Sequence, residues 1–416
     1  MAGGTFPLAA PRIGGWAMRT FEGVRVIDFT QAIAGPFATY QLALMGADVV
    51  KIEQPGIGDQ GRQMYPLDDG LQAAKYSAIY LSANAGKRSM TLDLKHPDAK
   101  EVIHRLVKDA DVVVENFKAG TMDRMGYGWD GLRAVNPKLI YCAVTGFGQT
   151  GPRSQSAAYD PTVQALSGMM AVNGTAATGP MRVGAIVVDM AAALTGAFAI
   201  AGALFKRERT GEGAMIDLSM QDVGASLTSP NLLQTVFGFE PALMGSRSLS
   251  GNPVADTHPT KDGVLLLMPA IEAQTAKVWG VIGRPELGED SRFSTLEARL
   301  EHEAECLQAL RAALSEDTAA NWEKRFAAAA VPAAEVLQLP DVLSDPQLAH
   351  RQLFGETLSP TDGRPLPYTN TPFKVSGEET GAGVPPPLVG ADTETVLAEI
   401  GYTVAEVESL RDRAVI

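Results

Sequence analysis

The chain has little cysteine, which excludes a fold held together by disulfides. Its 416 residues include only two cysteines, Cys142 and Cys306, whereas a disulfide framework needs four or more. Neither cysteine stands at metal-ligand spacing from other ligand-type residues, so we expect no metal. Scarce cysteine is typical of a reducing compartment, and we predict a cytoplasmic location.

Positive charge is also scarce. The chain has 35 Lys and Arg residues against 48 Asp and Glu residues, a formal net charge of -13. Such a chain repels nucleic acid, and no basic stripe is long enough to override that repulsion. We therefore expect no nucleic-acid partner, and an anionic ligand would need a locally basic pocket.

Long hydrophobic runs are missing. The apolar run from Met190 to Phe205 is shorter than the ~18–20 residues that span a bilayer, and it is rich in small residues. We interpret it as a buried helix and expect no membrane partner. Residues 1–20 lack the apolar segment of a signal peptide, so we expect a disordered leader, with Met18 the more natural first residue.

The chain also lacks a dinucleotide fingerprint. The turn "DFTQAIAGPFAT" contains only Gly35, followed by Pro36, where a pyrophosphate-binding turn needs G-x-G-x-x-G. This counts against a nicotinamide or flavin oxidoreductase, which remains the most distant alternative.

The pattern that is present alternates strands and helices. Strands are predicted at "VRVIDFT", "ADVVKIEQP", "KRSMTLDLK", "DVVVENF" and "PKLIYCAVTGFG", with helical periodicity between them. This predicts a doubly wound α/β domain with a parallel sheet. Ligands of such sheets bind at the carboxyl ends of strands, so the first turn is a candidate wall of a site.

The pattern of predicted elements changes near Gly245, where a turn-rich segment precedes a predicted strand and two predicted helices. We predict a large Rossmann-like domain over residues 21–244, a smaller α+β domain over 245–340, and a C-terminal segment over 341–416.

Asp189 stands at the edge of the apolar run and has two interpretations. Aspartate is a favoured N-cap, and a helix is predicted to begin at Met190. A carboxylate at a helix start with apolar neighbours is also a competent nucleophile, because it is poorly solvated. Asp160 precedes a proline, which favours a turn or cap role.

Basic side chains that could hold a phosphate are scattered through two segments: Lys87, Arg88, Lys95, Lys118 and Arg124. Lys and Arg make charge-assisted hydrogen bonds to phosphate. Each one, taken singly, is more often a solvated surface charge.

Several stretches together resemble the class III coenzyme A transferases. They are "VIDFTQAIAGPFATYQLALMGADVVKIEQPGIGD", "NAGKRSMTLDLK", "VVVENFKAGTMDRMGYGWD", "NPKLIYCAVTGFGQTGP", "YDPTVQALSGMM" and "FKRERTGEGAMIDLSMQDV". The family includes formyl-CoA transferase, carnitine CoA-transferase and the α-methylacyl-CoA racemases. The resemblance implies an interlocked, ring-like homodimer in which the C-terminal segment returns to the large domain.

The resemblance also implies a reaction and a set of site residues. Asp189 falls on the family's nucleophile, which forms aspartyl anhydride and aspartyl-CoA thioester intermediates while CoA moves from an acyl-CoA to a carboxylic acid. Coenzyme A is then a substrate, and no permanently bound cofactor is expected. The substrate and CoA contacts implied by the family pattern are Gln31, Ala32, Ile33, Ala34, Gln54, Leu92, Lys95, Asn116, Phe117, Arg124 and Tyr159.

The chain departs from the formyl-CoA transferase pattern at Ile33, which replaces a glutamine, and at Gln54, which replaces an arginine. The small-domain glycine loop of that enzyme has no counterpart around "SLSGNPVADTHPTKDG". These departures argue against formyl or oxalate chemistry.

The closest alternative is a 2-methylacyl-CoA racemase or epimerase. The racemases pair the aspartate with a histidine that falls on Tyr159 here, and a tyrosine hydroxyl, with an ordinary pKa of about 10, is a poor base at neutral pH. We therefore favour the transferase. The acceptor is predicted to be a small dicarboxylate, whose distal carboxylate Arg247 or His258 would hold. A CoA-binding protein without activity would leave Asp189 as a cap alone.

Overall fold

The structure, a computed structural model, describes residues 18–240 and 242–416. Residues 1–17 of the predicted leader lie outside the described residues. Contacts divide the chain into two compact units. The large unit contains residues 18–169, Val183–Ser229 and Pro346–Ile416, and the small unit contains Met170–Arg182 and Pro230–Asp345. The domain limits predicted at residues 245 and 340 stay a prediction.

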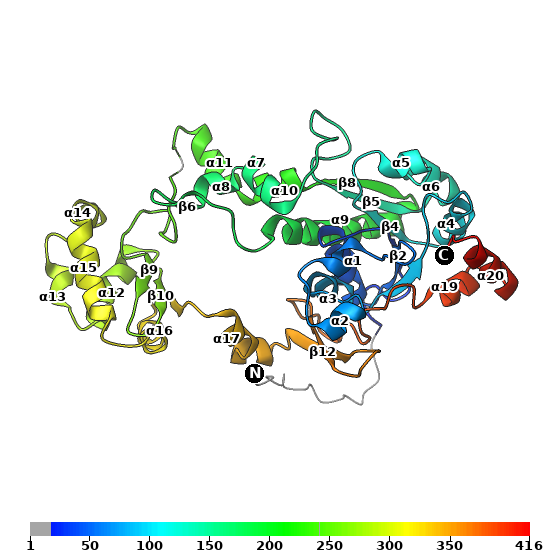
Figure 1. Cartoon of the computed structure of the whole chain (residues 1–416). Coiled ribbons are helices and arrows are strands. Elements are labelled where there is room, and N and C mark those ends of the chain that lie inside the picture. Colours follow the sequence, from blue (N-terminus) through cyan, green and yellow to red (C-terminus); the bar gives the residue numbers. More distant parts are fainter. Residues whose placement is uncertain (1–17, 241) are drawn as a thin grey trace. The chain divides into compact units, whose positions relative to one another are not determined.

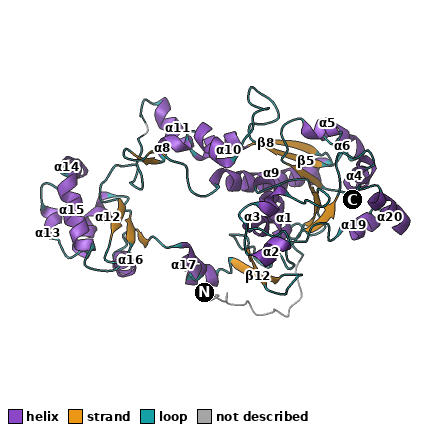
Figure 2. Ribbon diagram, in the orientation of Figure 1, coloured by secondary structure: helices purple, strands orange, loops and turns teal. Residues whose placement is uncertain are grey.

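The large unit is built on a six-stranded parallel sheet, so the predicted α/β class with a large parallel sheet is confirmed (Figure 2). Its strands are β1 (Arg25–Asp28), β2 (Asp48–Glu53), β3 (Arg88–Thr91), β4 (Val112–Glu115), β5 (Ile140–Thr145) and β8 (Ala214–Ser219). Their order is β3-β2-β1-β4-β5-β8. The chain therefore winds outward from β1 in one direction and from β4 in the other. The boundary between β1 and β4 is the point where an open α/β sheet binds ligands.

Alternate residues of each strand enter two separate cores, because successive side chains in a strand point to opposite faces. Val26 and Val112 pack on one face with α1 and α9. Ile27 and Val113 pack on the other face with α4 and the C-terminal helices. Figure 1 shows α1 and α9 lying together against the sheet.

The helices of the large unit are α1 (Ala34–Leu44), η1 (Gln60–Gln63), α2 (Asp69–Ala73), α3 (Ala78–Asn84), α4 (Ala99–Lys108), α5 (Thr121–Met125), α6 (Trp129–Val135), α7 (Asp160–Leu166), α9 (Val187–Thr210), α10 (Met220–Leu227), α18 (Pro346–His350), α19 (Thr393–Glu399) and α20 (Val404–Asp412). A hairpin of β12 (Phe354–Leu358) and β13 (Pro365–Thr369) belongs to the same unit. Helices α8 (Met169–Val172) and α11 (Ser229–Val236) lie where the chain passes between the units.

Helix α9 differs from its prediction. It begins at Val187 rather than Met190 and runs for 24 residues. Within the described residues, it is the helix that is long and apolar enough to cross a membrane by length and composition, although only 33% of its most apolar window is buried. It packs against α1, α7, α10, β5 and β8 of its own unit.

The small unit has its own sheet and core. Strands β9 (Asp256–Pro259), β10 (Val264–Leu267) and β11 (Ala333–Glu335) pair antiparallel in the order β11-β10-β9. Trp279, Phe293, Trp322 and Phe326 are buried in its core. Its remaining elements are β6 (Gly174–Thr175), β7 (Gly179–Pro180), α12 (Glu272–Val281), α13 (Glu286–Glu289), α14 (Leu296–Glu301), α15 (Glu303–Leu314), α16 (Ala319–Ala328) and α17 (Leu339–Leu343).

Candidate active site

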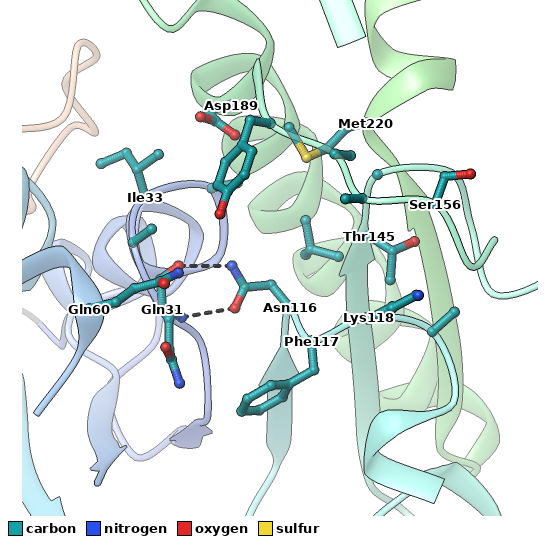
Figure 3. A pocket seen from close by; sticks show the side chains of 18 of the residues that line it. Gln31, Ile33, Gln60, Asn116, Phe117, Lys118, Thr145, Ser156, Asp189 and Met220 are labelled. Carbon is teal, nitrogen blue, oxygen red and sulfur yellow. Dashed lines mark hydrogen bonds between the residues drawn. The ribbon is translucent and has the colours of Figure 1, made fainter. Parts of the chain in front are cut away.

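The loops that follow β1 and β4 meet at the point where the strand order reverses. The backbone N–H of Gln31 donates to Asn116 Oδ1 over 2.8 Å, and Asn116 Nδ2 donates to the Gln31 carbonyl over 2.8 Å. Figure 3 shows this pair of bonds among the residues that line a cavity. The two connections are thus joined by one amide side chain.

The cavity has a volume of about 320 Å³ and lies entirely within the large unit. Eight of the predicted site residues line it: Gln31, Ala32, Ile33, Ala34, Asn116, Phe117, Tyr159 and Asp189. Residues from the carboxyl end of β5, Val144 and Thr145, complete the wall beside them. Residues from the loops after β1 and β4, from the end of β5 and from the start of α9 therefore line one cavity, and Asp189 is among them (Figure 3).

Four other predicted CoA contacts are not among the residues that line this cavity. Leu92 is buried in the sheet core, whereas Gln54, Lys95 and Arg124 are exposed. Arg124 donates to the Thr121 hydroxyl over 2.9 Å. Their contact with CoA stays a prediction.

Some lining residues were not among those predicted to form the site. Gln60 and Met64 come from the segment after β2, and Ser154 and Ser156 come from the loop after β5. The signal available in the sequence was their position after a predicted strand, because loops at that edge of a parallel sheet share one site. Lys118, which was considered for phosphate binding, also lines the cavity.

Asp189 does not cap helix α9, so the N-cap interpretation is wrong. It is the third residue of the helix, and Ile186 occupies the cap position. The cap is supplied by Asp160 of α7, whose Oδ2 accepts the backbone N–H groups of Val188 at 2.7 Å and Asp189 at 3.1 Å. The cap role expected for Asp160 is therefore confirmed, but on a helix that begins 27 residues further along the chain.

The environment of Asp189 makes its carboxylate unusually basic. Burial, and then the negative charge of Asp160, raise the pKa of Asp189 to about 7. Burial disfavours the charged form, and a like charge adds to that effect. A carboxylate with this pKa is a stronger nucleophile when ionised than an ordinary surface aspartate.

Lys87 and Arg88 are not part of a phosphate site. Lys87 is buried, and its ammonium donates to Asp28 Oδ2 over 2.9 Å. Burial lowers the pKa of Lys87 to about 8, although Asp28 opposes that shift. Arg88 pairs with Asp48 and Glu399. Both side chains therefore form ion pairs with other residues of the chain, and Lys87 is not a solvated surface charge.

The suggestion that His258 holds a substrate carboxylate is wrong. The residue is fully buried, and its Nε2 lies 3.0 Å from the Val254 carbonyl oxygen. Burial lowers the pKa of His258, so the neutral ring is favoured. Arg247 is paired with Asp256 and Glu303, which occupy the guanidinium that a substrate would need.

Among residues 18–240 and 242–416, no group of three or more His, Cys, Asp or Glu side chains could hold a metal ion.

Gly35, in the turn after β1, is required by packing, whereas the glycines of a pyrophosphate-binding turn are required by the ligand. A Cβ at Gly35 would lie 2.4 Å from Thr30 Cγ2. Glycine thus lets α1 start directly against the end of β1.

Comparison with known proteins finds one family along most of the chain. The model of CoA-transferase family III matches residues 21–393. A succinate–glutarate CoA-transferase of Agrobacterium fabrum is 36% identical over 91% of this chain and 95% of its own length. An acetyl-CoA:oxalate CoA-transferase of Acetobacter aceti is 36% identical over 86% of this chain and 89% of its own length.

A solved structure has the same fold. The crystal structure of a CAIB/BAIF family protein from Brucella suis superimposes with a TM-score of 0.83 at 30% sequence identity, covering 92% of this chain and all of that one. Both relatives compared by sequence are named as CoA-transferases and neither as a racemase.

Proposed function

Because the chain belongs to CoA-transferase family III, we propose that this transferase uses Asp189 as a nucleophile to move CoA from an acyl-CoA to a free carboxylic acid. The observation that carries the proposal is the position of Asp189. It faces a cavity lined by the loops after β1, β4 and β5, and its pKa is raised to about 7 by burial and by Asp160. A cap alone would have no reason to be destabilised in this way.

In the donor half of the reaction, the Asp189 carboxylate attacks the thioester carbonyl. The carbon–sulfur bond breaks, CoA leaves as a thiolate, and a mixed anhydride joins Asp189 to the acyl group. The thiolate then attacks the Asp189 carbonyl, releases the donor acid as a carboxylate and leaves CoA as an aspartyl thioester. Two displacements at activated carbonyls replace one difficult exchange.

In the acceptor half, the carboxylate of the second acid attacks the aspartyl thioester. CoA leaves again as a thiolate, and a second mixed anhydride forms. Attack of the thiolate on the acceptor carbonyl gives the new acyl-CoA and regenerates the Asp189 carboxylate. CoA takes part as a substrate throughout, and these steps use no resident cofactor.

Negative charge develops on the carbonyl oxygen at each step, and the start of α1 supports the proposed site. This helix begins at Ala34 on the cavity wall, and within the described residues no side chain caps its first turn, where Ala34 and Gly35 carry N–H groups and Pro36 does not. Amides at a helix N-terminus stabilise negative charge. We propose that CoA contacts Gln31, Ala32, Ile33, Ala34, Asn116 and Phe117 at this wall. The proposed contacts at Gln54, Leu92, Lys95 and Arg124 lie outside the cavity.

The acceptor is proposed to be a small dicarboxylate. Support comes from two relatives, which are named as the succinate–glutarate CoA-transferase of Agrobacterium fabrum and the acetyl-CoA:oxalate CoA-transferase of Acetobacter aceti. The second relative weakens the argument against oxalate drawn from Ile33 and Gln54, so oxalate belongs in the acceptor panel.

We also propose a cytoplasmic homodimer of the interlocked kind. The apolar side chains of Leu194, Phe198 and Phe205 on α9 are exposed within the single chain, and an apolar helix face of this kind favours association. The cytoplasmic location rests on the scarcity of cysteine.

The deciding experiment gives the purified protein a panel of acyl-CoA donors and free acids in D2O and follows the products by mass spectrometry. A new acyl-CoA that requires both partners is expected, and Asp189→Ala should abolish it while the matched control Asp412→Ala, at an exposed position of α20, retains it. Borohydride added after the donor should reduce a thioester on the peptide that contains Asp189. Deuterium at the α-carbon without exchange of acyl groups would instead show a racemase.

A further inference from the structure

The loop at residues 30–33 lies between β1 and α1 and contributes to the wall of the cavity that Asp189 also lines. Gln31, Ala32 and Ile33 all line the cavity. Ala32 has a φ of 63°, in the left-handed region that alanine enters only against steric resistance. A loop in this conformation needs contacts that hold it there.

Two buried charged side chains supply such contacts. The backbone N–H of Ala32 donates to Asp59 Oδ1 over 2.9 Å, and Lys51 Nζ donates to the Thr30 carbonyl over 2.7 Å. Lys51 Nζ also lies 2.7 Å from Asp59 Oδ2, and the two side chains are 0% and 1% exposed. The Lys51–Asp59 ion pair therefore binds the loop backbone at the carbonyl of Thr30 and at the N–H of Ala32, the strained residue.

The pair is itself fixed from behind. Lys51 belongs to β2, and the N–H of Asp59 donates to Glu53 Oε2 at the end of that strand over 2.7 Å. Arg62 Nε donates to the same oxygen over 2.7 Å. Burial alone would lower the pKa of Lys51, but the charges of Asp59 and Asp28 hold it above its ordinary value, so Lys51 carries its positive charge.

We propose that Lys51 and Asp59 are positioning residues, which hold the loop 30–33 in its left-handed conformation and so fix the wall that Asp189 faces. This inference rests on the proposed CoA transfer for its effect on turnover. Neither residue lines the cavity, so they act through the backbone of the loop. A small shift of the cavity wall that contacts the reacting groups reduces turnover more than it weakens substrate binding in the ground state.

The test compares two double variants. Lys51→Met with Asp59→Asn keeps a side-chain oxygen for the N–H of Ala32, whereas Lys51→Met with Asp59→Leu removes it. Both variants remove both charges, so neither leaves a lone buried ion. The difference between them measures the loss of the side-chain oxygen, which accepts the N–H of Ala32 and also the N–H of Gly61 over 2.7 Å.

Two readouts are taken on each folded variant. Amide hydrogen exchange of the peptide containing residues 30–34 should be slow in the wild type, faster in the Asn variant, which lacks the bond from Lys51 to the Thr30 carbonyl, and fastest in the Leu variant. The Leu variant should also lose roughly 100-fold in kcat relative to the Asn variant, with KM changed only a few-fold. Equal kcat values, or unchanged exchange in the Leu variant, would overturn the proposal.

If the Leu variant does not fold, Ala32→Val decides the question, because a β-branched residue strains the same backbone conformation without touching the buried pair. An unchanged kcat in Ala32→Val would then refute the role of the loop. If the wild type transfers no CoA with any donor and acid, the proposed function fails, whereas the exchange measurement still tests whether Asp59 holds the loop.

Discussion

At the scale of single residues, Asp189 is placed where it costs stability. Its pKa is raised to about 7 in the folded chain by burial and by Asp160, whereas an unfolded aspartate has a pKa of about 3.9. Between these values the folded state binds the proton more tightly. Stability therefore falls as the pH rises from about 4 to 7, and above pH 7 the whole penalty is present.

Asp189→Asn should accordingly stabilise the fold and abolish CoA transfer. We expect a gain of roughly 1–3 kcal/mol in the free energy of unfolding at pH 8 and a smaller gain at pH 5. The gain at pH 8 is smaller than the free energy equivalent to the full pKa shift, because the side chain is partly exposed to solvent. Urea unfolding at the two pH values measures this. A loss of stability at both values would indicate that the carboxylate serves the fold.

The charge of Asp160 can be separated from its capping hydrogen bonds. Asp160→Asn keeps an oxygen for the amides of Val188 and Asp189 but removes the like charge. The pKa of Asp189 should fall, and the acidic limb of the kcat/KM profile should move down by roughly 0.5–1 pH unit, because the effect of burial remains. An unmoved limb would show that burial alone sets the basicity of Asp189.

At the scale of elements, the junction of β1 and α1 depends on close approach at Gly35. A Cβ at this position would lie 2.4 Å from Thr30 Cγ2, and Thr30 is buried with its hydroxyl bound to Asp28. Gly35→Ala should therefore cost about 2 kcal/mol or more of stability and weaken CoA binding.

The matched control for Gly35→Ala is Gly280→Ala in α12, where an added Cβ meets nothing within 4 Å. It should leave the fold intact or stabilise it by up to about 1 kcal/mol through helix propensity. Thermal unfolding and calorimetric titration with CoA measure both variants. Equal effects of the two substitutions would contradict the packing argument.

The elements differ in how far the sequence alone could predict them. The strands follow from local periodicity, so β1 and β4 were predictable. The turn after β1 was a candidate wall because ligands bind at this edge of a parallel sheet, whereas the individual contacts at residues 31–34 came from the resemblance to the family. The start of α9 was misplaced because its cap comes from Asp160 in another helix, and the fate of Lys87 depended on Asp28, 59 residues away. Partners so distant in sequence leave no periodic signal.

At the scale of the whole molecule, α9 has two differently packed faces. Val188, Ala192 and Ile200 are buried against the sheet and α1. On its other side Phe198 is 78% exposed and Phe205 is 59% exposed. A helix of this composition is expected to bury both faces, either against a second chain or in a membrane.

The proposed homodimer predicts that Phe198 is covered by the partner chain. Phe198→Asp should then reduce the mass measured by light scattering from two chains towards one, because an unpaired carboxylate is costly at an apolar interface. Ala405→Asp, at an exposed position of α20, adds the same charge elsewhere and should keep the dimer. A monomeric wild type would refute the dimer, and a wild type that floats with lipid vesicles while Phe198→Asp does not would place this face of α9 in a membrane.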